Sequence, residues 1–124
     1  MMDQPIIVKV DTEYLRQESE PENSRFVFAY QITIHNRGDE ATQLLSRHWV
    51  VTDGNESKKV YRGMGVVGEQ PLITPGQSYK YTSGIVLDTP VGTMQGHYSM
   101  RDPQGRSYDV PIAPFLLSTP NTVN

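Results

Sequence analysis

The chain has 124 residues and a net charge of −3 at pH 7. This length corresponds to one domain, large enough to bury a core without covalent staples. Cysteine is absent, which excludes disulfides, thiolate metal sites and thiol nucleophiles and fits a reducing compartment. The acidic balance and the lack of a basic run argue against nucleic-acid binding.

The N-terminus lacks the features of a signal peptide. Asp3 stands where a basic region is needed, and Lys9 ends the following apolar run too early. No later stretch approaches the roughly 18 apolar residues of a membrane span. We therefore expect a cytoplasmic protein without membrane association.

Apolar residues recur with a period of two, which is typical of half-buried antiparallel strands. The period is clearest where Phe26, Phe28, Tyr30, Ile32 and Ile34 alternate with small or polar residues. No ten-residue segment shows a helical period. Strands are predicted at 6–16, 25–36, 43–53, 57–62, 78–86, 93–101 and 106–112.

Turn-forming residues separate most of these strands. The pattern predicts one all-β domain over residues 1–124, an immunoglobulin-like or fibronectin type III-like sandwich of about seven antiparallel strands. The stretch around Trp49 is apolar on both faces, so its orientation stays open, although a central strand with Trp49 between the sheets would suit this fold. We expect order over about 5–117 and a frayed tail at 118–124.

Gly63-Met64-Gly65-Val66-Val67-Gly68 matches the GxGxxG pattern of dinucleotide-binding folds. In those folds the glycines join a strand to a helix whose N-terminus holds the pyrophosphate. Here Pro71 and then Pro75-Gly76 follow, so no helix can begin within reach. We favour a loop in which glycine permits close approach or positive φ. An anion-binding nest beside Arg62 stays open as an alternative.

The chain has three histidines, His35, His48 and His97. His35 and His97 are predicted to face outward from opposite sheets, so we expect no metal site and weak or no cobalt binding. Glu18, Glu20 and Glu22 gather in one loop and could hold a hard cation, but a solvated acidic turn is the favoured interpretation.

Nucleophilic catalysis has little support in the sequence. Ser46 and His48 share one strand face, yet no strained elbow or orienting carboxylate accompanies them. Paired carboxylates in apolar settings are also not apparent. We expect no enzyme activity, no catalytic residues and no cofactor.

Five stretches occur in an order and at spacings that identify a family. They are Ser19-Glu20-Pro21-Glu22, Leu44-Leu45-Ser46-Arg47-His48-Trp49, Gly65-Val66-Val67-Gly68-Glu69-Gln70-Pro71, Tyr81-Thr82-Ser83-Gly84 and Leu87-Asp88-Thr89-Pro90-Val91-Gly92-Thr93-Met94-Gln95-Gly96. Together they resemble the ApaG family, small bacterial domains, over about residues 5–117.

The resemblance implies a fibronectin type III-like sandwich and a role in divalent-cation tolerance, described as cobalt resistance and magnesium efflux. Related domains in eukaryotic F-box proteins and in a polymerase-interacting protein look like protein-binding modules. The family has no agreed catalytic residues, so the resemblance supplies none.

We favour a non-enzymatic binding or regulatory module that presents loops or an edge strand to a protein partner of unknown identity. The first alternative is a small-ligand carrier with an anion or nucleotide phosphate at the glycine-rich loop, or with a divalent cation. The second alternative is an enzyme of unrecognised type. We expect neither nucleic acid nor membrane as partner, and a monomer or weak homodimer.

The working surface is predicted around 62–71 with Arg47 and His48 beside it. The connection 63–77 spans about fifteen residues where four to six are usual, and long ordered loops are often functional. Alternatively, Arg47 pairs with a carboxylate such as Glu69 and only fixes the loop. The candidate binding residues are Arg47, His48, Arg62, Gly63, Gly65, Gly68, Glu69 and Gln70.

We predict that ATP, NAD and related dinucleotides bind no tighter than millimolar, because Pro71 blocks the helix that the glycine pattern would need. Isothermal titration calorimetry with each nucleotide measures this. Saturable micromolar binding that disappears in Gly65→Val would contradict the structural interpretation of the motif.

Overall fold

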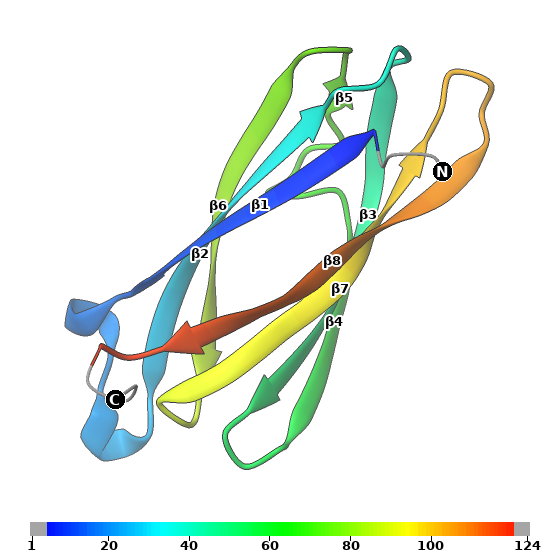
Figure 1. Ribbon diagram of the computed structural model, residues 1–124. Helices are drawn as coiled ribbons and strands as arrows, with labels where there is room; N and C mark the ends of the chain where they lie inside the picture. Colours follow the sequence, from blue (N-terminus) through cyan, green and yellow to red (C-terminus); the bar gives the residue numbers. More distant parts are fainter. Residues whose placement is uncertain (1–4, 121–124) are drawn as a thin grey trace.

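The computed structural model describes residues 5–120, which form two antiparallel β-sheets packed face to face (Figure 1). One sheet has the order β1-β2-β6, with β1 at Ile6–Tyr14, β2 at Phe26–Asn36 and β6 at Ser78–Leu87. The other has the order β4-β3-β7-β8, with β3 at Thr42–Asp53, β4 at Lys58–Met64, β7 at Val91–Arg101 and β8 at Ser107–Ser118. A short β5, Leu72–Ile73, pairs with β3.

This arrangement confirms the predicted all-β sandwich. The helical elements of the described residues are two single 3₁₀ turns, η1 (Arg16–Glu18) and η2 (Pro21–Asn23). None of the helices between residues 5 and 120 has the length and apolar character that a membrane crossing requires.

All seven predicted strands are present, but several boundaries differ from the prediction. β4 continues to Met64 and β5 interrupts the connection that was expected to be long and irregular. β8 continues to Ser118 across Pro111 and Pro114, which an edge strand tolerates. The expected fraying from residue 118 onward is not seen at 118–120, because Ser118 still belongs to β8 and the Thr119 N–H donates to the Pro90 carbonyl. Residues 121–124 lie outside the described part of the chain.

A β-bulge at Leu45 explains why the sequence around Trp49 could not be oriented. Leu44 pairs with Met100 and Ser46 with Ser99, so Leu45 is an extra residue in β3. The bulge shifts the alternation by one position. Leu44 before it and Trp49 after it are therefore both buried, although an uninterrupted strand would place them on opposite faces.

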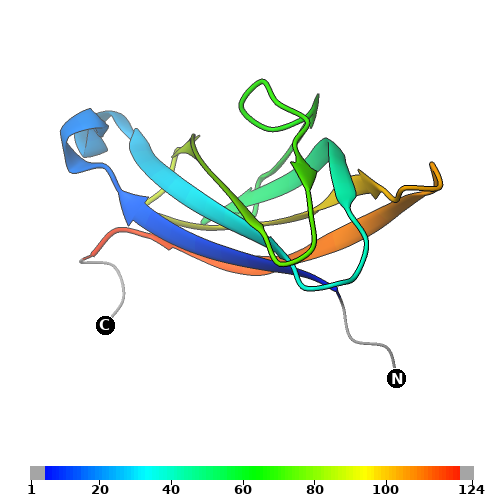
Figure 2. The same ribbon diagram turned by 90° about the horizontal axis from the view of Figure 1, so that it is seen from above.

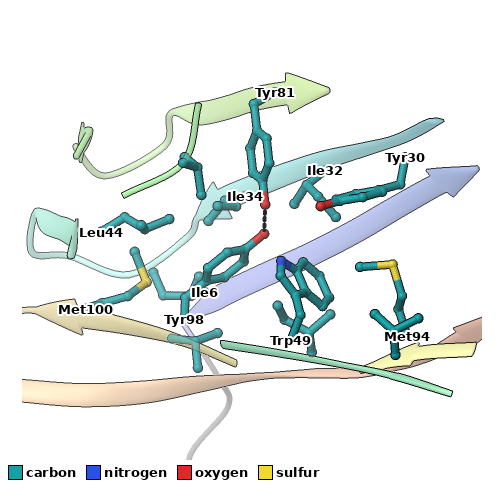
Figure 3. Close-up of a cluster of buried hydrophobic side chains, with 14 of the residues drawn as sticks. Ile6, Tyr30, Ile32, Ile34, Leu44, Trp49, Tyr81, Met94, Tyr98 and Met100 are labelled. Carbon is teal, nitrogen blue, oxygen red and sulfur yellow. Dashed lines mark hydrogen bonds between the residues drawn. The ribbon is translucent and has the colours of Figure 1, made fainter. Parts of the chain in front are cut away.

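Trp49 is the centre of the core that this bulge makes possible. It is 2 % exposed, and its ring lies edge-on to three aromatic rings, two of which, Tyr30 and Tyr98, are labelled in Figure 3. The ring centroids lie 5.6 Å away at Tyr30, 5.8 Å at Phe115 and 6.2 Å at Tyr98. Edge-to-face contacts in this range are favourable beyond their buried area. Trp49 thus lies between the sheets, the position that would suit the predicted fold although the sequence left the orientation of this strand open.

One hydrogen bond links the two sheets through the core. Tyr81 of β6 and Tyr98 of β7 point toward each other and share a bond between their hydroxyl groups (Figure 3). Burial raises the pKa of both phenols well above the usual value near 10. The native sandwich therefore keeps both protons at a pH where an unfolded chain loses them.

We predict that this pair makes the fold sensitive to alkaline pH. The raised pKa stabilises the native state fully below about pH 10, and the contribution is lost as pH rises through the higher native values. Above about pH 10 the free energy of unfolding should fall more steeply in the parent than in Tyr98→Phe, by about 1.4 kcal/mol per pH unit. Urea denaturation at a series of pH values measures both slopes. Equal slopes would contradict the assignment.

Candidate binding site at the β4 edge

Strand β4 forms the outer margin of the five-stranded sheet, where the opposite sheet covers it least. All of its residues are exposed except Gly63, which is half-buried. Met64 is 72 % exposed and Val60 is 53 % exposed. Three more large apolar residues along this margin are exposed, namely Tyr61, Val67 and Leu72. This concentration of apolar surface is the feature of the molecule that most resembles a binding surface.

The glycine-rich segment between β4 and β5 folds into a tight turn that stands out from the two layers (Figure 2). Gly65 has φ 65°, and a Cβ there would lie 2.2 Å from the Glu69 carbonyl oxygen, so only glycine fits. Gly68 has φ 82° at the tip. The motif therefore serves positive φ and close approach, with strands on both sides in place of a strand and a helix.

The amides of this turn already have protein partners. Gly65 N–H donates to the Leu45 carbonyl over 2.7 Å, and Val66 and Glu69 exchange two backbone bonds of 2.8 and 2.9 Å. An anion could bind these three amides only by breaking those bonds. The geometry thus argues against an anion-binding nest built from these three amides.

Arg47 holds the turn from the inner side of the sheet. It pairs with the buried Tyr98, so both side chains point inward, and its guanidinium lies beneath Gly63. Nη1 donates to the carbonyls of Gly65 at 2.7 Å and of Met64 at 3.3 Å. The alternative pairing with Glu69 was wrong in its partner, because Arg47 binds backbone carbonyls, and the loop-fixing role of Arg47 stays a prediction.

Glu69 and Gln70 also fix the turn. The Glu69 carboxylate accepts a bond of 2.8 Å from the Tyr79 hydroxyl on β6. Burial and this carboxylate together raise the pKa of Tyr79. The Gln70 side chain donates to the Leu45 carbonyl over 2.8 Å, so the bulged residue accepts two bonds from the turn. The turn is consequently ordered before any partner binds.

The outer face of the sheet carries a row of polar side chains across four strands. Arg62 Nε donates to His48 Nδ1 over 3.2 Å, and the His48 ring stacks on His97 with centroids 4.9 Å apart. On the far side, His97 Nε2 lies 4.0 Å from the Asp109 carboxylate. His48, Arg62 and His97 line one shallow hollow. The other residues that border it are Ser46, Arg47, Gly63 and Met64.

The candidate residues named from sequence therefore separate into two groups. Arg47, Gly63, Gly65, Glu69 and Gln70 shape and fix the turn, with Gly68 at its tip. His48 and Arg62 face outward and border the hollow. Sequence reasoning missed His97 as their neighbour. The alternation of residues in its strand predicts that His97 faces outward. The pairing of His48 with His97, however, depends on the register of β3 and β7, which the sequence does not reveal.

Cation ligands do not gather in the described part of the chain. His35 lies on β2, in the opposite sheet from His97, as expected. No group of three or more histidine, aspartate or glutamate residues is placed to hold a metal within residues 5–120. In the acidic loop, the Glu20 carboxylate accepts a bond from the Asn23 side chain, and Ser19 bridges Leu15 and Val27.

Comparisons of the sequence and of the structure with known proteins point to one family. A family model described as the ApaG domain matches residues 16–102. Protein ApaG of Pseudomonas putida is 52 % identical over 96 % of this chain and 94 % of its own length. Protein ApaG of Pectobacterium carotovorum is 48 % identical over 96 % of this chain and 95 % of its own length. A solved ApaA protein of Bordetella pertussis is 46 % identical, with a TM-score of 0.92 over 94 % of this chain and 95 % of that one.

We predict that Arg47→Ala destabilises the fold whereas Arg62→Ala does not. Losing Arg47 leaves two carbonyls without a charged donor and should cost about 2 kcal/mol. Arg62 is exposed, so its loss should change stability by less than about 0.5 kcal/mol. Thermal denaturation of both variants beside the parent gives the comparison. Equal melting temperatures for the two variants would show that Arg47 does not fix the turn.

Proposed function

The chain belongs to the ApaG domain family, and we propose that it acts as a non-catalytic protein-binding module whose contact surface is the β4 edge with the turn 65–71. The observation that carries the proposal is the gathering of Val60, Tyr61, Met64, Val67 and Leu72 along one margin of the sandwich. Exposed apolar groups of this kind mark interaction sites in small soluble domains.

The ordered turn supports the same function. Arg47, Glu69 and Gln70 hold it through side-chain hydrogen bonds, so a partner would meet a surface that is already shaped. Preformed contact surfaces lose less conformational entropy on binding. The cost of ordering the turn is met during folding.

The chemistry of the described residues gives no support to catalysis. The groups with raised pKa are tyrosines that bond to each other in the core or to Glu69 at the surface. A catalytic centre would place such groups around a cleft with a nucleophile or a base. A cytoplasmic role in cobalt resistance or magnesium efflux, as the family implies, would then act through a partner rather than through ion binding by this chain.

We predict that a photo-crosslinking amino acid at Tyr61 captures a discrete partner protein in cell lysate, and that the same amino acid at Leu116 does not. Leu116 is a matched control, because it is 50 % exposed and lies on β8, the opposite edge of the same sheet. Mass spectrometry identifies the captured protein.

Charge substitution provides an independent check. Val60→Glu and Met64→Glu should abolish the capture, whereas Leu116→Glu should leave it unchanged, and all variants should keep the parent melting temperature. The same protein captured equally from positions 61 and 116 would remove the β4 edge from consideration.

A further inference from the structure

The backbone groups on the open side of β4 can be assigned from the ladder between β3 and β4. Gly65 N–H bonds to the Leu45 carbonyl at one end, and Asp53 N–H bonds to the Ser57 carbonyl at the other. Antiparallel pairs alternate between bonded and non-bonded positions. Both ends give the same assignment, in which the N–H and C=O groups of Lys58, Val60, Arg62 and Met64 point away from β3.

These outward backbone groups have no neighbouring strand. Within residues 5–120, β4 pairs with β3 alone. The opposite side of β3 is occupied by β7 along ten register positions, so the sheet can extend only from β4 on this side. An edge of this kind is a template for one more strand.

The side chains along the edge alternate in chemistry. Lys58, Val60, Arg62 and Met64 share the outer face of the sheet in the sequence cation, apolar, cation, apolar. The strand has no acidic residue, and neither do the β3 residues that pair with these four positions. Neither Lys58 nor Arg62 takes part in the ion pairs found between residues 5 and 120. Among the residues that the structure describes, no carboxylate lies within ion-pair distance of either cation.

The positive charge and the alternating side chains of β4 together indicate which kind of segment pairs with this edge. We propose that the partner adds an extended segment to β4 as an additional strand, with acidic side chains opposite Lys58 and Arg62 and apolar side chains opposite Val60 and Met64. This inference rests on the proposed protein-binding function, and it specifies the binding mode and the chemistry of the partner. A second copy of the chain is disfavoured, because its own β4 would bring three further cations, Lys58, Lys59 and Arg62, to the same edge.

The alternation sets the sequence of a probe. A short, fluorescently labelled peptide with glutamate and valine at alternate outward positions and threonine between them should bind saturably, and rising salt should weaken it. The same peptide with lysine in place of glutamate should not bind. Absence of binding by the glutamate peptide, or equal binding of the lysine peptide, would overturn the proposal.

A backbone variant separates strand addition from ordinary side-chain contact. Val60→Pro removes an N–H that points away from β3, so the β3–β4 ladder stays intact while the bond to the peptide is lost. Peptide affinity should fall about tenfold or more, because an acceptor on the peptide is left unpaired. Val60→Ala also loses the apolar side chain but keeps the N–H, so its peptide affinity should stay about tenfold or more above that of Val60→Pro.

Amide hydrogen exchange of the unmodified protein gives a readout that does not depend on variants. Adding the peptide should slow exchange at Val60 and Arg62, while Tyr61, already bonded to β3, changes little. Unchanged exchange at Val60 and Arg62 while a partner still cross-links at Tyr61 would leave the protein-binding function standing and refute strand addition. Dimerisation through β4 in sedimentation experiments would make a second copy the occupant and refute the acidic segment.

Discussion

The β-bulge at Leu45 is the constraint on which the rest of the structure depends. Because β3 gains one residue there, the side chains of Leu44, Arg47 and Trp49 all face the inner side. Without the bulge, Trp49 would point to solvent and the aromatic core around it would have no centre. The bulge interrupts the pairing with β7, whereas the Leu45 carbonyl points to the other side of β3, toward β4 and the turn. That carbonyl then accepts bonds from Gly65 and Gln70, which attaches the turn to the sheet.

The same shift separates two arginines that lie close together. Arg47 enters the inner side, where its guanidinium fits beneath Gly63 and binds two carbonyls. Arg62, on the neighbouring strand, stays on the outer face beside His48. One cation therefore stabilises the turn and the other remains exposed at the edge. Both residues are arginines on neighbouring strands, and the face of the sheet on which each side chain lies decides its role.

The parts of the fold that the sequence predicted are those where the period of two is unbroken. β2 alternates without interruption, and its predicted bounds of 25–36 differ from the structure by one residue. The prediction failed where bulges change the phase. The β7–β8 register shifts between Met94 and Gly96, which hid the continuation of β8 beyond Ile112. The inward direction of Arg47 also depends on the bulge before it, which gives no local signal in the sequence. The stacking of His48 on His97 depends on pairing between distant strands, so no local pattern could reveal it.

The β4 edge can be open because the stability of the sandwich does not depend on its outward groups. Apart from Val66 of the turn, the core side chains come from strands that are paired on both sides or covered by the opposite sheet, and the bond between Tyr81 and Tyr98 joins the two sheets. Lys58 and Arg62 oppose pairing of β4 with the β4 strand of a second copy, as charged residues do on natural edge strands. In the proposed binding mode, an edge that repels copies of itself while displaying apolar groups would favour a partner of opposite charge. The charges that oppose pairing between copies would then also define the chemistry of the partner.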